Sequence, residues 1–114
     1  GVQLAAPPDG AALLAILRAE DGAARAVPDG EIYAAQARLA TEEGLFVEPA
    51  AALSLAGLLA DHRAGRLAAG DTIVCILTGS GFKDREAMAR LAAGRPPLAP
   101  IPLDGLQAAL AGIE

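Results

Sequence analysis

An uninterrupted apolar run, Thr72-Ile-Val-Cys-Ile-Leu77, restricts the fold of this chain more than any other feature. The turn residues Gly70-Asp71 precede it, and Thr78-Gly-Ser-Gly81 follows at once. A strand with one solvated face alternates polar and apolar residues, whereas a parallel strand covered by helices on both faces does not. We therefore expect residues 72–77 to form a buried strand of a mainly parallel sheet.

Helical patterns on both sides of this run supply the covering layers. Pro49 suits a first helical position, and Gly44 and Gly65 suit left-handed C-caps. The helix that follows Pro49 carries no charge over residues 50–60 and is expected in the interior. Helices are expected at residues 10–19, 29–43, 49–64, 84–91 and 104–111, with short strand segments at 23–27 and 45–47.

This alternation of helices and short apolar strands predicts an α/β fold, with helices around a short, mainly parallel sheet, in a single domain spanning residues 1–114. Only 3% of the residues are aromatic although 54% are hydrophobic, so the core must be built from closely packed Ala, Leu, Val and Ile. The Pro-rich residues 96–102 are expected to connect the last two helices.

Charge and hydropathy limit the partners. The net charge is −5 without clustered Lys and Arg, which argues against a nucleic-acid surface. No apolar stretch reaches the roughly 18 residues of a membrane span, and no export leader is recognisable, so a membrane is not an expected partner either. Cys75 is the only cysteine and cannot form an internal disulfide, which favours the cytoplasm.

The loop after the main strand, Thr78-Gly-Ser-Gly81, is the first candidate for chemistry. Open parallel sheets bind ligands at the carboxyl ends of their strands. The two glycines let backbone amides approach an anion or a flat ring, and Thr78 and Ser80 carry hydroxyls that donate or accept hydrogen bonds. The loop lacks the spacing of the Walker loop and of the dinucleotide fingerprint, so on its own it is equally consistent with a simple turn.

Two ordered motifs give this loop a more specific interpretation. The first is Glu43-Gly-Leu-Phe-Val-Glu-Pro-Ala50, and the second, after a helix, combines the apolar strand with Thr78-Gly-Ser-Gly81 and Lys83-Asp84. In this order and spacing the chain resembles the C-terminal portion of threonine synthases, which are fold type II pyridoxal-phosphate enzymes of the tryptophan synthase β-like superfamily. The similarity covers about residues 10 to 90.

The resemblance implies pyridoxal 5'-phosphate as cofactor, an amino-acid substrate, and conversion of O-phosphohomoserine to threonine and phosphate. It also implies that the hydroxyl of Thr78 hydrogen-bonds the pyridine nitrogen, with Gly79, Ser80 and Glu48 as further cofactor-binding residues. A neutral hydroxyl withdraws fewer electrons than a carboxylate partner would, which suits elimination and replacement reactions. Ser80 stands where the family usually has Asn, and residues 50–52 are all Ala where a Ser is common, so contacts there are expected to differ.

The remaining reactive residues receive structural interpretations. Lys83 is the only lysine, and beside Asp84 it is expected to be a solvated ion pair or a helix-start charge. The resemblance implies that the lysine which forms a Schiff base with the cofactor lies far upstream in a longer parent enzyme, together with a Gly-rich phosphate-binding loop. The chain alone is therefore expected to be inactive and to hold no catalytic residue. His62 is expected on a helix surface rather than at a metal site, and Cys75 as an inert buried thiol.

Other functions stay open at this point. Threonine dehydratase, cysteate synthase and tryptophan-synthase-β-like enzymes are related members of the superfamily. The alternative from another class is a stand-alone, non-catalytic module that binds a small anion or another protein. The chain opens Gly1-Val2-Gln3 without an initiator Met, so we expect a fragment whose partner is the remainder of the parent enzyme. Open sheet edges would also favour a homodimer.

Overall fold

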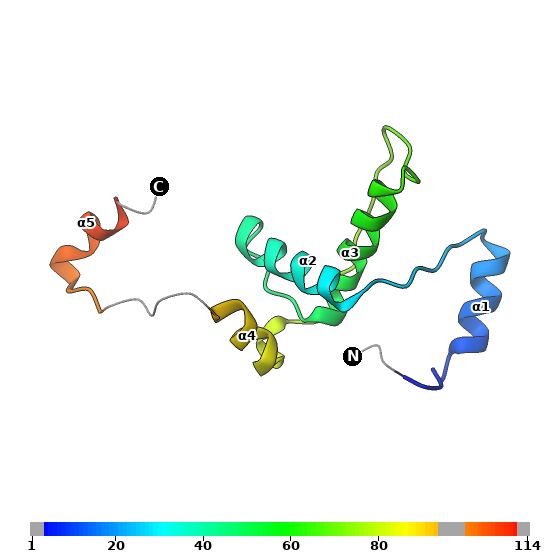
Figure 1. Ribbon diagram of the computed structural model, residues 1–114, viewed down its shortest axis with the longest axis horizontal. Coiled ribbons are helices and arrows are strands. Elements are labelled where there is room, and N and C mark those ends of the chain that lie inside the picture. The colour runs from blue at the N-terminus through cyan, green and yellow to red at the C-terminus, as the bar shows by residue number, and fades with distance from the viewer. Residues whose placement is uncertain (1–3, 94–99, 112–114) are drawn as a thin grey trace.

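The computed structural model describes residues 4–93 and 100–111 of the chain. Helices α2 and α3 pack against each other at the centre, whereas α1 and α5 lie towards opposite ends of the molecule (Figure 1). In chain order the elements are α1 (Gly10–Ala19), α2 (Asp29–Glu42), α3 (Pro49–Arg63), the 3-10 helix η1 (Gly81–Lys83), α4 (Arg85–Ala92), the 3-10 helix η2 (Leu103–Gly105) and α5 (Leu106–Leu110).

The core is the contact between α2 and α3. Small side chains on α3 let the two helices approach closely, and most of the buried residues are apolar: Ile32, Ala35 and Leu39 on α2, Ala51, Ala52 and Ala56 on α3, and Val47 between them. The prediction that α3 lies in the interior is correct only for the face that carries Ala51, Ala52 and Ala56. Its leucines, which lie on other faces, are half-buried.

The start of α3 and the ends of α2 and α3 confirm the proline and glycine signals in the sequence. Gly44 and Gly65 follow α2 and α3 with φ of 68° and 66°, a left-handed conformation that glycine adopts without steric cost. Pro49 is the first residue of α3. Asp84 caps α4, since its Oδ1 accepts a hydrogen bond from the amide of Ala87 at 2.9 Å.

The predicted parallel sheet is not formed by the described residues. Their one β-type pairing is an isolated antiparallel bridge between Val47 and Ser80, so residues 23–27 and 72–77 belong to no ladder. Residues 71–77 return from the far end of α3 to its beginning (Figure 1). The local pattern favours a strand, but a strand also needs a neighbouring backbone to hydrogen-bond. No neighbouring strand is present among the described residues, so the α/β expectation is not met there.

Residues 72–77 nevertheless keep the two-faced character of a strand. Leu77 packs against the core of α2 and α3, whereas Val74 and Ile76 are 81% and 72% exposed. Cys75 is half-buried, because only one face of this segment is covered. The expectation of a buried thiol is therefore wrong for this structure.

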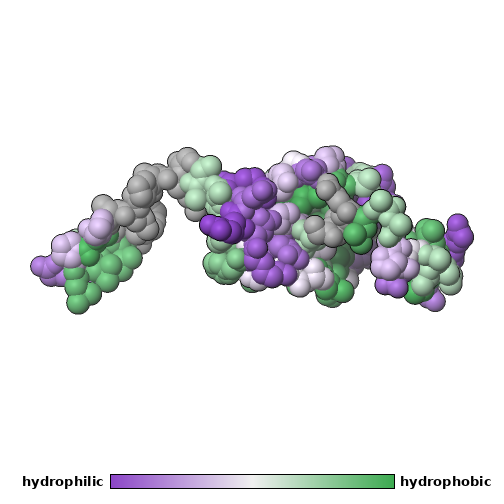
Figure 2. Space-filling model, turned by 90° about the horizontal axis from the view of Figure 1, so that it is seen from below, coloured by the Kyte–Doolittle hydropathy of each residue, from purple (hydrophilic) through white to green (hydrophobic). Residues whose placement is uncertain are grey.

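The outlying helices leave apolar side chains in solvent. Leu13 and Ile16 of α1 are more than half exposed, as are Leu103 and Leu110 at the other end of the chain. Figure 2 shows hydrophobic surface over α5 at one end of the molecule. The predicted helices near residues 10–19 and 104–111 are confirmed in position, although neither has apolar cover. None of the helices described is long and apolar enough to cross a membrane.

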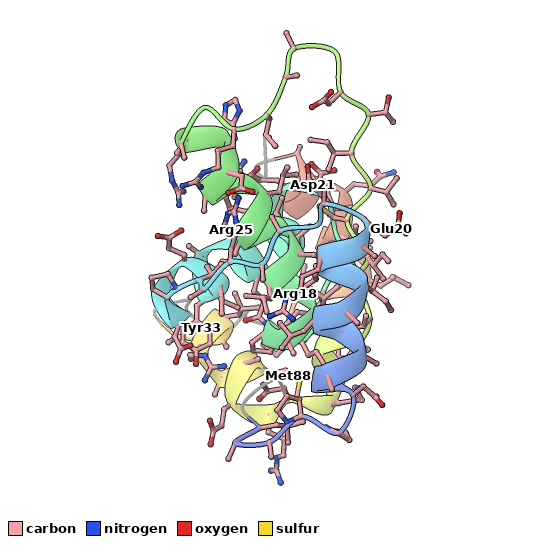
Figure 3. The ribbon with its side chains drawn as sticks, turned by 90° about the vertical axis from the view of Figure 1, so that its right-hand side faces the viewer. Arg18, Glu20, Asp21, Arg25, Tyr33 and Met88 are labelled. Carbon is pink, nitrogen blue, oxygen red and sulfur yellow. The ribbon has the colours of Figure 1, made fainter. Side chains whose placement is uncertain are left out.

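Polar contacts fasten the flanking segments to the helix pair. Arg25, seen beside α3 in Figure 3, donates from Nε to Asp61 at 3.0 Å, and Arg66 reaches the same carboxylate oxygen at 2.7 Å. The hydrogen bonds from Arg66 and Arg25 lower the pKa of the Asp61 carboxyl. A cation–π contact links α4 to α2, because the guanidinium of Arg90 in α4 lies 4.3 Å from the ring centre of Tyr33 in α2.

Candidate functional site

The two sequence motifs lie against each other, although α3 separates them along the chain. The amide of Glu48 donates to the carbonyl of Gly79 at 3.0 Å, and the amide of Gly81 donates to the carbonyl of Phe46 at 3.0 Å. These bonds flank the isolated bridge and hold the residues before α3 antiparallel to the loop. The structure thus places Glu48 directly beside the predicted cofactor loop, 78–81.

Each glycine of the loop faces a protein group that would have to move if the glycine carried a side chain. A Cβ on Gly79 would overlap the carboxylate of Glu48 and lie 3.0 Å from its Cγ. A Cβ on Gly81 would lie 2.7 Å from the ring of Phe46. That ring packs edge to face against Phe82, with 5.1 Å between centroids. Here the glycines admit protein groups, whereas the sequence suggested only that they would admit a ligand.

The two hydroxyls of the loop differ in their surroundings. Ser80 Oγ accepts a hydrogen bond from the amide of Phe82 at 3.3 Å, which leaves its proton free to donate. Thr78 is exposed, and its hydroxyl makes no hydrogen bond within the described part of the chain. The predicted contacts of Thr78, Gly79, Ser80 and Glu48 with a cofactor remain predictions.

Lys83 pairs with the first motif rather than with its neighbour in sequence. Its Nζ lies 3.3 Å from Glu48 Oε2, and the two side chains are 65% and 27% exposed. Asp84 instead caps α4 and lies 4.0 Å from Arg90. The expectation of a solvated ion pair for Lys83 is confirmed, but its partner is Glu48, which sequence proximity to Asp84 did not indicate.

Gln36 is a site-supporting residue that sequence reasoning missed. It is 1% exposed, and its Nε2 donates to the carbonyl of Val47 at 2.7 Å. This bond fixes the segment that carries Glu48 against α2. A signal was available in the sequence, because Gln36 lies four residues after Ile32 and three before Leu39, inside the apolar stripe of α2.

The other residues singled out in the sequence take structural positions. Ala51 and Ala52 are 1% and 0% exposed in the helix core, where a hydroxyl would need a partner. His62 is exposed on α3, as predicted. No group of three or more His, Cys, Asp or Glu side chains within residues 4–93 and 100–111 is arranged to hold a metal ion.

A hollow of about 140 Å³ opens between α2 and α3, away from the loop. Charged and apolar residues line it together: Glu31, Ala34, Ala35, Arg38, Ala56, Leu59 and Arg63. The charged groups in this lining are paired within the protein, Arg63 with Glu31 and Arg38 with Glu42. None of the predicted cofactor-binding residues lines this hollow.

Comparison with known proteins identifies the family of this chain. The sequence profile of the family described as pyridoxal-phosphate dependent enzyme matches residues 1–79. Among curated relatives, the threonine synthase of Mycobacterium leprae is 43% identical over 81 residues, which cover 71% of this chain and 22% of that protein. The threonine synthase of Methanocaldococcus jannaschii is 51% identical over 69 residues, covering 60% of this chain and 17% of that protein. This chain thus spans about a fifth of the length of these relatives.

Proposed function

Because the chain belongs to the family of pyridoxal-phosphate-dependent enzymes, we propose that it forms part of a threonine synthase-like lyase that converts O-phosphohomoserine to threonine and phosphate. The observation that carries the proposal is the pairing of Glu48 with Gly79, which joins the two family-like motifs in one place. The similarity to threonine synthases, at 39–51% identity in the relatives compared, supports it as well.

The residues of the loop fit the ring end of pyridoxal 5'-phosphate. Thr78 offers an exposed hydroxyl that is not engaged by another described residue, directly after the apolar segment. Glu48, Gly79 and Ser80 would line the same place. When bound, the cofactor withdraws electrons from the amino-acid substrate, and a neutral hydroxyl at the ring nitrogen would moderate that withdrawal. In this proposal Thr78 orients and tunes the ring.

The lysine that carries the cofactor is proposed to come from another part of a longer protein. Lys83, the only lysine here, is engaged by Glu48 at 3.3 Å and is largely exposed. The chain by itself would therefore be inactive, and the remainder of the enzyme would be its partner. We propose that residues 72–77 pair there with parallel strands, because their exposed face of Val74 and Ile76 is suited to cover by helices.

The proposal is tested in the longer enzyme with the isosteric change Thr78→Val. Loss of one neutral hydrogen bond to the ring is expected to lower phosphate release from O-phosphohomoserine about tenfold. Thr78→Ser should restore most of the rate, and Thr41→Val, at an exposed residue of α2, is the matched control. Formation of ammonia from threonine without phosphate release would favour a dehydratase-like lyase and overturn the assignment.

Two further proposals concern the isolated chain. The bare apolar face of residues 72–77 favours a homodimer, which sedimentation at several concentrations would detect. A cytoplasmic location is proposed from the single free cysteine, Cys75. The alternative of a stand-alone small-anion or interaction module predicts that the natural protein has no upstream lysine region, which its full-length sequence would decide.

A further inference from the structure

Lys83 occupies a position from which it can control the shape of the candidate site. It is in the short helix η1 directly after the loop, and its amide lies 3.4 Å from the carbonyl of Ser80. Its ammonium reaches back to the carboxylate of Glu48, which lies against Gly79, at 3.3 Å. The side chain therefore spans the loop from its end to the motif that precedes α3.

The position of the Glu48 carboxylate depends closely on the loop. It lies where a side chain of Gly79 would be, and the amide of Glu48 donates to the Gly79 carbonyl at 3.0 Å. Backbone and side chain of Glu48 thus contact the same glycine. A carboxylate released from Lys83 would be free to rotate away from Gly79 and take water as its partner.

No other described residue competes for either charge. Asp84 is the nearest acidic residue to Lys83 in the sequence, but its carboxylate caps α4 and faces Arg90. Among the described residues, the ion pair of the Glu48 carboxylate is the one with Lys83. Because both partners are partly exposed, the pair contributes little to global stability, and its effect is local.

We infer that Lys83 is a positioning residue: its ammonium holds the Glu48 carboxylate on Gly79 and thereby sets the conformation of the loop that carries Thr78. The geometric part of this inference is independent of any cofactor. Its consequence for cofactor binding rests on the proposed function, because Lys83 would act on the ring only through Glu48 and the loop.

The test uses the full chain with Lys83→Met, Lys83→Arg and the control Arg38→Met, which removes the exposed Arg38–Glu42 pair on α2. Hydrogen exchange of the Glu48 amide, which reports its bond to Gly79, is expected to quicken about two- to fivefold in Lys83→Met, the range an exposed ion pair contributes. Lys83→Arg should restore the slow exchange, and Arg38→Met should leave it unchanged. Circular dichroism verifies that each variant keeps its helices.

The response of the Gly79 amide resonance to salt is a second test. A purely structural role of Lys83, independent of its charge, would leave this response unchanged. About 1 M sodium chloride screens charges beyond roughly 3 Å, so the Gly79 amide resonance of the unmodified chain is expected to shift towards its position in Lys83→Met. The resonance of the Met variant should respond less. Identical Gly79 resonances and exchange rates in the unmodified and Met chains would overturn the inference. A failure of Thr78→Val to affect phosphate release would instead count against the proposed function alone.

Discussion

The buried hydrogen bond from Gln36 gives the sharpest prediction about the stability of the site. Gln36→Met keeps the length and approximate volume of the side chain but removes the donor to the Val47 carbonyl, now at 2.7 Å. Val47 is 8% exposed, so its carbonyl would lose its partner with little access to water. A buried group left unsatisfied costs about 1–3 kcal/mol, and the near-isosteric Met adds little cavity cost. We expect the free energy of unfolding to fall by about 2 kcal/mol.

Urea denaturation followed by far-ultraviolet circular dichroism measures this change. For a folded unit of this size the free energy of unfolding falls by about 1–2 kcal/mol per molar urea. The urea concentration at the unfolding midpoint should therefore fall by about 1–2 M. Gln107→Met is the matched control, because Gln107 is exposed in α5 and should change stability by less than about 0.5 kcal/mol. A Gln36→Met chain as stable as the unmodified one would show that this bond does not hold the Val47 segment in place.

Three further changes have expected outcomes. Gly81→Ala should destabilise the chain more than Gly79→Ala in urea denaturation, since a Cβ on Gly81 meets an aromatic ring whereas one on Gly79 meets the movable Glu48 carboxylate; equal losses would contradict this packing. Gly44→Ala, at φ 68°, should cost about 1 kcal/mol in the same assay, and a neutral result would argue against the left-handed cap. Because the pKa of Asp61 is lowered in the folded chain, its contribution is present above the unfolded value near pH 4 and lost as the pH falls below it. Thermal unfolding at pH 7 and pH 3 should therefore show a smaller loss in Asp61→Asn than in the unmodified chain.

The parts of the structure predicted well from the sequence are those set by local chemistry. Pro49 begins α3 because its missing amide is not needed there, and Gly44 and Gly65 end helices because they adopt positive φ freely. The helix expected at residues 84–91 begins close to that position, where Asp84 accepts a hydrogen bond from the amide of Ala87, three residues later. Each of these residues acts on backbone within one or two helical turns of itself. The local sequence is therefore enough to predict where the helix begins or ends.

The parts predicted poorly depend on partners distant in the sequence. Residues 72–77 have the pattern of a strand, but pairing is a property of two segments, and the described residues supply only one. Lys83 pairs with Glu48 rather than with adjacent Asp84. The choice of partner depends on where the loop lies in three dimensions, which the local sequence does not determine. Gln36 was not predicted as a core residue although it lies in the apolar stripe of α2, and nothing local identifies the Val47 carbonyl as its partner.

The pairing at the base of α3 also has a consequence for protein engineering. The bonds from Glu48 to Gly79 and from Gly81 to Phe46 close a long loop that consists of α3 and its return segment. The entropic cost of closing a flexible loop grows only with the logarithm of its length, so doubling the length of the whole loop costs about 0.6 kcal/mol. The mostly exposed turn at residues 64–70 lies at the far end of this loop. A fluorescent reporter or affinity peptide grafted there should leave the closure at the other end intact.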